Sequence, residues 1–164
     1  MGTEDRPAAL ERLEVFIGTW QLEASFPQDA ESDDDAFAVF EWALDGRFLI
    51  QRTKAPDPAP DSLAIVALNA DGRTYTQHYF DSRGVVRVYS MTFHDGVWKL
   101  LRDKPDFSPV DFSQRYTGTF SDDGNSIVGR WEISHDGLRW EHDFDLTYLK
   151  VGEPGVRGRA PSSR

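Results

Sequence analysis

The sequence predicts an all-β protein: a single antiparallel up-and-down β-barrel of about ten strands with a short N-terminal helix. Asp-Gly interrupts the chain five times, and this pair favours β-hairpins because a type I′ turn needs positive φ at both central residues. The segments between these breaks alternate in hydrophobicity and are rich in β-branched and aromatic residues. A meander of this length would expose two unpaired edge strands, and closing it into a barrel removes both. The breaks lie at Asp45-Gly46, Asp71-Gly72, Asp95-Gly96, Asp123-Gly124 and Asp136-Gly137.

The predicted helix covers residues 8–17, where Leu10, Leu13 and Ile17 share one face after a proline suited to the first turn. Each predicted strand lies between two turn or loop signals. The strands are predicted at residues 18–27, 36–44, 47–54, 63–69, 73–81, 85–94, 97–103, 112–120, 126–135 and 138–151.

The chain is predicted to form one barrel domain over residues 8–151, followed by a disordered tail over residues 152–164 that is rich in Gly, Pro, Ser and Arg. Two longer loops are predicted, at the acidic stretch 29–35 and at the proline-rich stretch 55–61. The acidic stretch lacks the spacing of an EF-hand loop, so no metal is expected. A two-sheet sandwich is the alternative architecture, but its Greek-key crossings need longer connections than this chain offers.

The composition limits the classes of partner. The formal net charge of the 164 residues is −10, and such an acidic surface repels phosphate backbones and anionic membranes. Cysteine is absent, which removes disulfides and thiolate metal sites. The N-terminal residues contain no apolar signal-peptide core, and no segment approaches eighteen apolar residues. We therefore expect a cytoplasmic protein with neither a nucleic-acid nor a membrane partner.

The side chains that face the interior follow from the register of the hairpins. A two-residue turn at Asp95-Gly96 sets Tyr89 opposite Arg102, on the face where the aromatic residues nearer the turn also meet. Arg87 precedes Tyr89 by two residues and shares its face. The interior is therefore predicted to contain Arg87, Tyr89 and Arg102.

The last hairpin and the strand before it add further candidates. A two-residue turn at Asp136-Gly137 sets Trp131 opposite His142, and the opposite face of this hairpin is charged. The face with Trp131 is therefore expected to be the interior. In the preceding strand, Gln114 and Tyr116 alternate with polar residues and are predicted to point the same way.

The break at residues 82–84 leaves two registers open. A three-residue loop turns Gln77 and Tyr79 inward, whereas a two-residue loop turns His78 and Phe80 inward instead. The hairpin at Asp71-Gly72 favours the first register, because it places the same two side chains beside the apolar face of the preceding strand.

Two buried arginines need acceptors, because an unpaired buried charge is costly. Glu41 and Arg52 share one face of their hairpin, so Glu41 is a carboxylate that could enter the barrel. Two interpretations remain open: a polar network that braces the barrel, or a cluster that faces a ligand. The ligand-binding residues predicted on the second interpretation are Gln77, Tyr79, Arg87, Tyr89, Arg102, Gln114, Tyr116 and His142.

The first strand carries a family-like motif. Phe16-Ile17-Gly18-Thr19-Trp20 matches the F-x-G-x-W of lipocalins and fatty-acid-binding proteins, in which the Trp plugs the closed end of the barrel. Asp81–Val85, Phe112–Gly118 and Trp140–Tyr148 are similar to an uncharacterised family of bacterial lipocalin-like proteins, and the resemblance runs from about residue 10 to residue 151. The resemblance implies a calycin barrel with Trp20 at its closed end, and brings no established activity.

The chain departs from the better-known relatives in three places. The Arg-x-Tyr that grips a fatty-acid carboxylate is absent from the last strand, which reads Thr147-Tyr148-Leu149-Lys150. Lys150 is the only substitute for the lipocalin arginine that covers the Trp. Haem-binding nitrobindins are similar in size and strand count, but their glycine-rich run is replaced here by Gln21-Leu22-Glu23-Ala24, and no histidine matches their iron ligand.

These residues predict a binding protein for a small amphipathic molecule, anionic or carbonyl-bearing, held by aromatic walls and the Arg/Tyr/Gln cluster, with no cofactor. No catalytic or nucleotide-binding motif is present. The alternative is a barrel-type cyclase or isomerase that uses His142 or Tyr89 as acid–base and Arg87 or Arg102 to stabilise negative charge. A haem protein of the nitrobindin kind is the third alternative, and association into a homodimer is left open.

Overall fold

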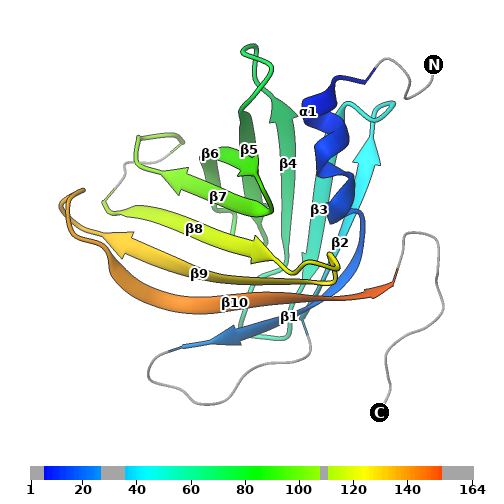
Figure 1. Ribbon diagram of the computed structural model, residues 1–164. Helices are drawn as coiled ribbons and strands as arrows, with labels where there is room; N and C mark the ends of the chain where they lie inside the picture. Colours follow the sequence, from blue (N-terminus) through cyan, green and yellow to red (C-terminus); the bar gives the residue numbers. More distant parts are fainter. Residues whose placement is uncertain (1–5, 27–35, 108–110, 153–164) are drawn as a thin grey trace.

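A computed structural model describes residues 6–26, 36–107 and 111–152. Over these residues the chain forms a closed barrel in which each strand pairs antiparallel with the next, and the last strand pairs with the first (Figure 1). This architecture confirms the predicted all-β barrel and shows that the sandwich alternative is wrong. The strands are β1 (Gly18–Ser25), β2 (Ala36–Ala43), β3 (Phe48–Lys54), β4 (Ser62–Leu68), β5 (Tyr75–Asp81), β6 (Val86–His94), β7 (Val97–Arg102), β8 (Ser113–Phe120), β9 (Ser126–Ser134) and β10 (Glu141–Gly152).

A short helical segment closes one end of the barrel. It begins as α1 (Ala8–Glu11) and tightens into a 3₁₀ helix, η2 (Arg12–Phe16), before the chain becomes extended at Ile17. Leu13 and Phe16 are fully buried, and the Phe16 ring packs against aromatic rings from β2, β6, β7 and the end of β8. The predicted helix therefore exists, with its second half, Arg12–Phe16, in the 3₁₀ form. No helix in the described residues is long and apolar enough to cross a membrane.

Trp20 lies at this closed end, as the sequence motif predicts. Its side chain is fully buried, and its indole Nε1 donates a 2.8 Å hydrogen bond to the carbonyl oxygen of Phe16. The Lys150 ammonium group lies 5.3 Å from the centre of the Trp20 ring, within the range of a cation–π contact. Lys150 therefore lies over the Trp20 ring, where the resemblance to lipocalins leads us to expect a basic side chain.

The register of β5 and β6 confirms the three-residue loop. Tyr79 pairs with Arg87 and Gln77 pairs with Tyr89, and the N–H of Asp81 donates to the carbonyl of the residue that follows the loop. All four side chains in these two pairs are thereby turned toward the interior.

The register of β9 and β10 differs from the prediction, and His142 faces outward as a result. The connection is not a two-residue turn: Asp136 Oδ1 accepts the N–H groups of Leu138 and Arg139, which builds a longer turn that ends before Glu141. A β-bulge between His142 and Phe144 shifts the register again. Trp131 therefore pairs with Phe144, while His142 pairs with outward-facing Glu132.

The tail predicted over residues 152–164 lies outside the described residues except for Gly152, with which β10 ends. The acidic stretch 29–35 also lies outside them.

Candidate functional site

The barrel contains a cavity of about 320 Å³. Its lining extends from the aromatic floor above the helix end to Pro60 in the β3–β4 loop and Arg83 in the β5–β6 turn, both at the other end of the barrel. This volume lies at the small end of the range for small-molecule sites. Six of the predicted site residues line the cavity: Gln77, Tyr79, Arg87, Tyr89, Gln114 and Tyr116.

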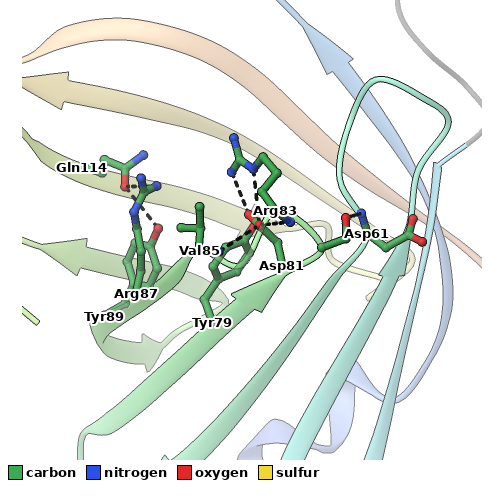
Figure 2. Close-up of polar contacts among 9 residues, drawn as sticks. Asp61, Tyr79, Asp81, Arg83, Val85, Arg87, Tyr89 and Gln114 are labelled. Atoms are coloured by element: carbon green, nitrogen blue, oxygen red, sulfur yellow. Dashed lines mark hydrogen bonds and ion pairs between the residues drawn. The ribbon is translucent and has the colours of Figure 1, made fainter. Parts of the chain in front are cut away.

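Arg87, Tyr89 and Gln114 form a hydrogen-bonded group on one wall (Figure 2). Arg87 Nη1 donates to Gln114 Oε1 at 3.4 Å, and the Tyr89 hydroxyl donates to the same oxygen at 3.2 Å. Burial raises the pKa of Tyr89, although the charge of Arg87 opposes this shift, so the hydroxyl remains a donor near neutral pH. One amide oxygen thus orients two donors from β6.

The charge of Arg87 has no carboxylate partner among the described residues. Its Nε atom is also buried and has no hydrogen-bond partner. A guanidinium has five N–H donors, and each buried donor without an acceptor, such as this Nε–H, costs free energy. Arg87 is therefore a cationic donor held at the cavity wall.

Asp81 organises the mouth of the cavity (Figure 2). Its buried carboxylate accepts hydrogen bonds from the Tyr79 hydroxyl at 2.8 Å and from Arg83 Nη2 at 2.7 Å. Burial raises the pKa of Asp81, but the hydrogen bonds from Arg83 and Tyr79 outweigh it and lower the pKa to about 2. Arg83 is thereby fixed beside the mouth. The adjoining Ser82 also exchanges hydrogen bonds with Asp61, which ties this turn to the β3–β4 loop.

Arg102 does not line the cavity. Its guanidinium forms a two-point ion pair with Asp106, and the two side chains are 2% and 3% exposed. The sequence analysis missed this carboxylate because Asp106 lies in the β7–β8 loop, where no strand register places a side chain. The carboxylate proposed from the sequence, Glu41, lies instead on the outer surface beside Arg52, with a separation of 3.7 Å between charged atoms.

His142 is also outside the cavity, which corrects the expectation that it faces inward. Its Nε2 atom lies 2.8 Å from Asp145 Oδ1 on the outer face, and about one-third of its side chain is exposed. His78 alternates with inward-facing Gln77 and Tyr79 and so points outward as well. The described cavity lining contains no histidine. It therefore fits neither a histidine-ligated haem nor the acid–base role that the enzyme alternative gave to His142.

Tyr116 shapes the floor of the cavity. Its hydroxyl donates to the carbonyl oxygen of Leu146 at 2.9 Å, so the ring crosses the inner face of β9. An added Cβ at Gly129 would overlap with the Tyr116 hydroxyl, and one at Gly118 would lie 2.7 Å from its ring. The two glycines thus create the space that the Tyr116 ring occupies.

The structure also places in the cavity residues that were not predicted from the sequence. Gln51 and Thr53 from β3 line the cavity together with Tyr148 from β10. Gln51 Nε2 lies 3.3 Å from the Tyr148 hydroxyl oxygen, across 97 residues of sequence. The alternation of β3 was the available signal for Gln51, but it does not reveal a partner on a strand so distant in sequence.

The electrostatic character of the cavity is opposite to that of the whole chain. Arg83 and Arg87 are the only Arg, Lys, Asp or Glu residues in the described lining, whereas the chain carries a formal net charge of −10. The remaining walls are largely aromatic, and Trp131 contacts both Tyr89 and Tyr116, with ring centres 5.8 and 5.3 Å apart. Arg83 is paired with Asp81, so the arrangement can hold an apolar body while presenting the positive charge of Arg87 to one end of it.

The fold and the cavity define a closed ten-stranded antiparallel β-barrel with an interior, small-molecule-sized cavity in the described residues. No protein-family model matches the chain, and neither does any curated protein. Among solved structures, the chain is similar to one titled "Crystal Structure of Rv2717c from M. tuberculosis". The sequences are 13% identical, the match covers 90% of this chain and 99% of the other, and the TM-score is 0.57. At this identity the likeness supports the barrel fold alone.

Proposed function

We propose that this protein binds a small amphipathic anion inside its barrel, with the acidic group of the ligand at Arg87. The observation that carries the proposal is the guanidinium of Arg87, which lines the cavity without a carboxylate partner among the described residues. A carboxylate or another oxyanion supplies the charge and the acceptors that this group lacks. The aromatic rings along the cavity suit an apolar ligand body.

The proposal includes membership of the calycin class of ligand-binding barrels. The sequential strand order and the burial of Trp20 behind the N-terminal helix support this assignment. Binding, rather than catalysis, is the better-supported role, because His142 lies on the outer face and the remaining polar groups of the cavity are mainly tyrosines and glutamines beside Arg83 and Arg87.

A fluorescence-displacement titration tests the proposal. Fatty acids, aromatic acids and their neutral amide analogues are compared on the wild-type protein and on Arg87→Met, which keeps much of the apolar stem and removes the charge. We expect the acids to bind more tightly than the amides to the wild type. The variant should lose roughly ten- to a hundredfold in affinity for acids and little for amides, as loss of a charge-assisted hydrogen bond predicts.

Arg52→Met is the matched control, because it also removes one arginine but on the exposed outer face. It should leave all affinities unchanged. Equal binding of acids and amides to the wild type, together with equal affinities in Arg87→Met, would show that Arg87 only braces the barrel.

A further inference from the structure

A second polar group lies in the cavity, on a different wall from Arg87. Gln51 Nε2 is 3.3 Å from both the Tyr148 hydroxyl oxygen and Thr53 Oγ1. These residues belong to β3 and β10, and at least two strands separate each of these from β6, which carries Arg87. The cavity therefore has a cationic pole, formed by Arg87, and a neutral pole, formed by Gln51, Thr53 and Tyr148, with aromatic rings between them.

The neutral pole presents a donor without an acceptor. Burial raises the pKa of Tyr148 to about 12, against the lowering effect of Gln51, so the hydroxyl keeps its proton at neutral pH. Its oxygen already accepts from Gln51. Within the described residues, no acceptor receives the Tyr148 hydroxyl hydrogen, and a buried donor without an acceptor is destabilising.

The Trp98 ring packs beside the Tyr148 ring. Its ring centre lies 5.5 Å from that of Tyr148, and both residues line the cavity. Trp98 is 2% exposed, and its indole Nε1 is buried with no hydrogen-bond partner in the described residues. Trp98 lies on β7, the neighbour of β6, but pairs with Phe93 at the helix end of the barrel, so it lies away from Arg87 along the barrel axis. Tyr148 lines the cavity with no acceptor for its hydroxyl hydrogen in the described residues, which indicates an acceptor supplied from outside the chain.

We infer that the ligand is a compact oxo acid: an acid whose apolar body carries a carbonyl oxygen, which accepts the hydroxyl hydrogen of Tyr148. This inference rests on the proposed binding of an anion at Arg87 and adds the chemistry of the opposite end. The small cavity and its aromatic walls favour a short, flat body over a long flexible chain.

Matched probes separate the two ends of the ligand. Positional isomers of fluorenone-carboxylate are compared with the corresponding fluorene-carboxylates, which lack only the ring carbonyl, and with neutral fluorenone. Binding is measured by isothermal titration to the wild type, Tyr148→Phe and Tyr75→Phe. Tyr75 is the control because its hydroxyl is also buried but donates to the carbonyl of Ala9, outside the cavity.

We expect the best-fitting fluorenone acid to bind the wild type roughly three- to tenfold more tightly than its fluorene partner, the gain of one neutral hydrogen bond. Tyr148→Phe should abolish this difference, and Tyr75→Phe should keep it. If each fluorenone acid binds the wild type no more tightly than its fluorene partner, the inference is overturned, even if Tyr148→Phe fails to fold. A difference that persists in folded Tyr148→Phe would also overturn it.

The outcomes distinguish this inference from the proposed function. If acids still bind more tightly than neutral fluorenone but the ring carbonyl makes no difference, the anion site stands and the second pole is wrong. If acids and neutral fluorenone bind equally, or none of the probes binds, both fail.

Discussion

The guanidinium of Arg102 donates two hydrogen bonds to the carboxylate of Asp106, with nitrogen–oxygen distances of 2.8 and 3.0 Å. The same carboxylate accepts the backbone N–H of Val88 at 2.9 Å. The backbone pairing of β6 with β7 ends at Ser90 and Leu101, and Val88 of β6 lies outside the paired stretch. Asp106 therefore connects the two strands where they no longer pair with each other directly. The ion pair is therefore a structural link in the barrel wall, on the side of the cavity that carries Arg87.

Arg102→Met should destabilise the protein strongly. Removing one partner of a buried ion pair leaves an uncompensated charge, which costs about 3–5 kcal/mol. The free energy of unfolding, measured by urea denaturation, checks this value. Arg52→Met is the control, because its pair with Glu41 is about half exposed and such surface pairs contribute at most about 1 kcal/mol. Equal losses in the two variants would contradict the structural role of Arg102.

Gly129→Ala should destabilise the barrel by about 1–3 kcal/mol, the usual cost of overpacking a core. The new methyl group would overlap with the Tyr116 hydroxyl and displace the ring that forms the cavity floor. Gly152→Ala is the control, because an added Cβ there meets nothing within 4 Å. Thermal unfolding of both variants measures the difference, and a Gly129→Ala melting temperature equal to that of the control would disprove the close approach.

Trp20→Ala should cost roughly 3–5 kcal/mol, as truncation of a large buried aromatic residue does. The substitution removes a fully buried ring and its hydrogen bond to Phe16, and so opens the helix end of the barrel. Trp140→Ala is the control, because Trp140 is only partly buried, on the outer face beneath Arg115. A denaturation midpoint that moved no further for Trp20→Ala than for Trp140→Ala would refute the plug assignment.

Asp81 should make the protein sensitive to acid. The pKa of Asp81 is lowered to about 2 in the folded chain, and that of an unfolded aspartate is about 3.9. Its stabilising effect is therefore complete above pH of about 4 and is lost as the pH falls toward about 2. The loss is on the order of 2 kcal/mol.

Melting temperatures of the wild type and Asp81→Asn at pH of about 5 and about 2.5 test this expectation. The amide cannot titrate, so the variant should lose less stability over this interval than the wild type. Other aspartates with lowered pKa values, Asp71 among them, titrate in both proteins and cancel in the comparison. Parallel losses in the two proteins would show that Asp81 does not carry the effect.

The sequence by itself determined the barrel and much of one cavity wall. A short turn has few conformations, so the pairing of strands across it follows from local residues. At residues 82–84 the sequence left two registers open and favoured the three-residue loop, which the structure confirms by pairing Tyr79 with Arg87. The burial of Trp20 also followed from a local motif, because its position after the helix brings it to the closed end.

The tertiary structure alone decided the partner of Arg102, the direction of His142 and the second pole of the cavity. Asp106 reaches Arg102 from a loop, whose path no alternation pattern describes. The longer turn at Asp136 shifted the pairing by one residue and so turned His142 outward, and the bulge after His142 turned the following residues of β10 back toward the interior. Gln51 and Tyr148 meet across 97 residues because closure of the barrel brings β3 and β10 around one cavity. Such contacts depend on the global path of the chain, and local sequence patterns contain no information about that path.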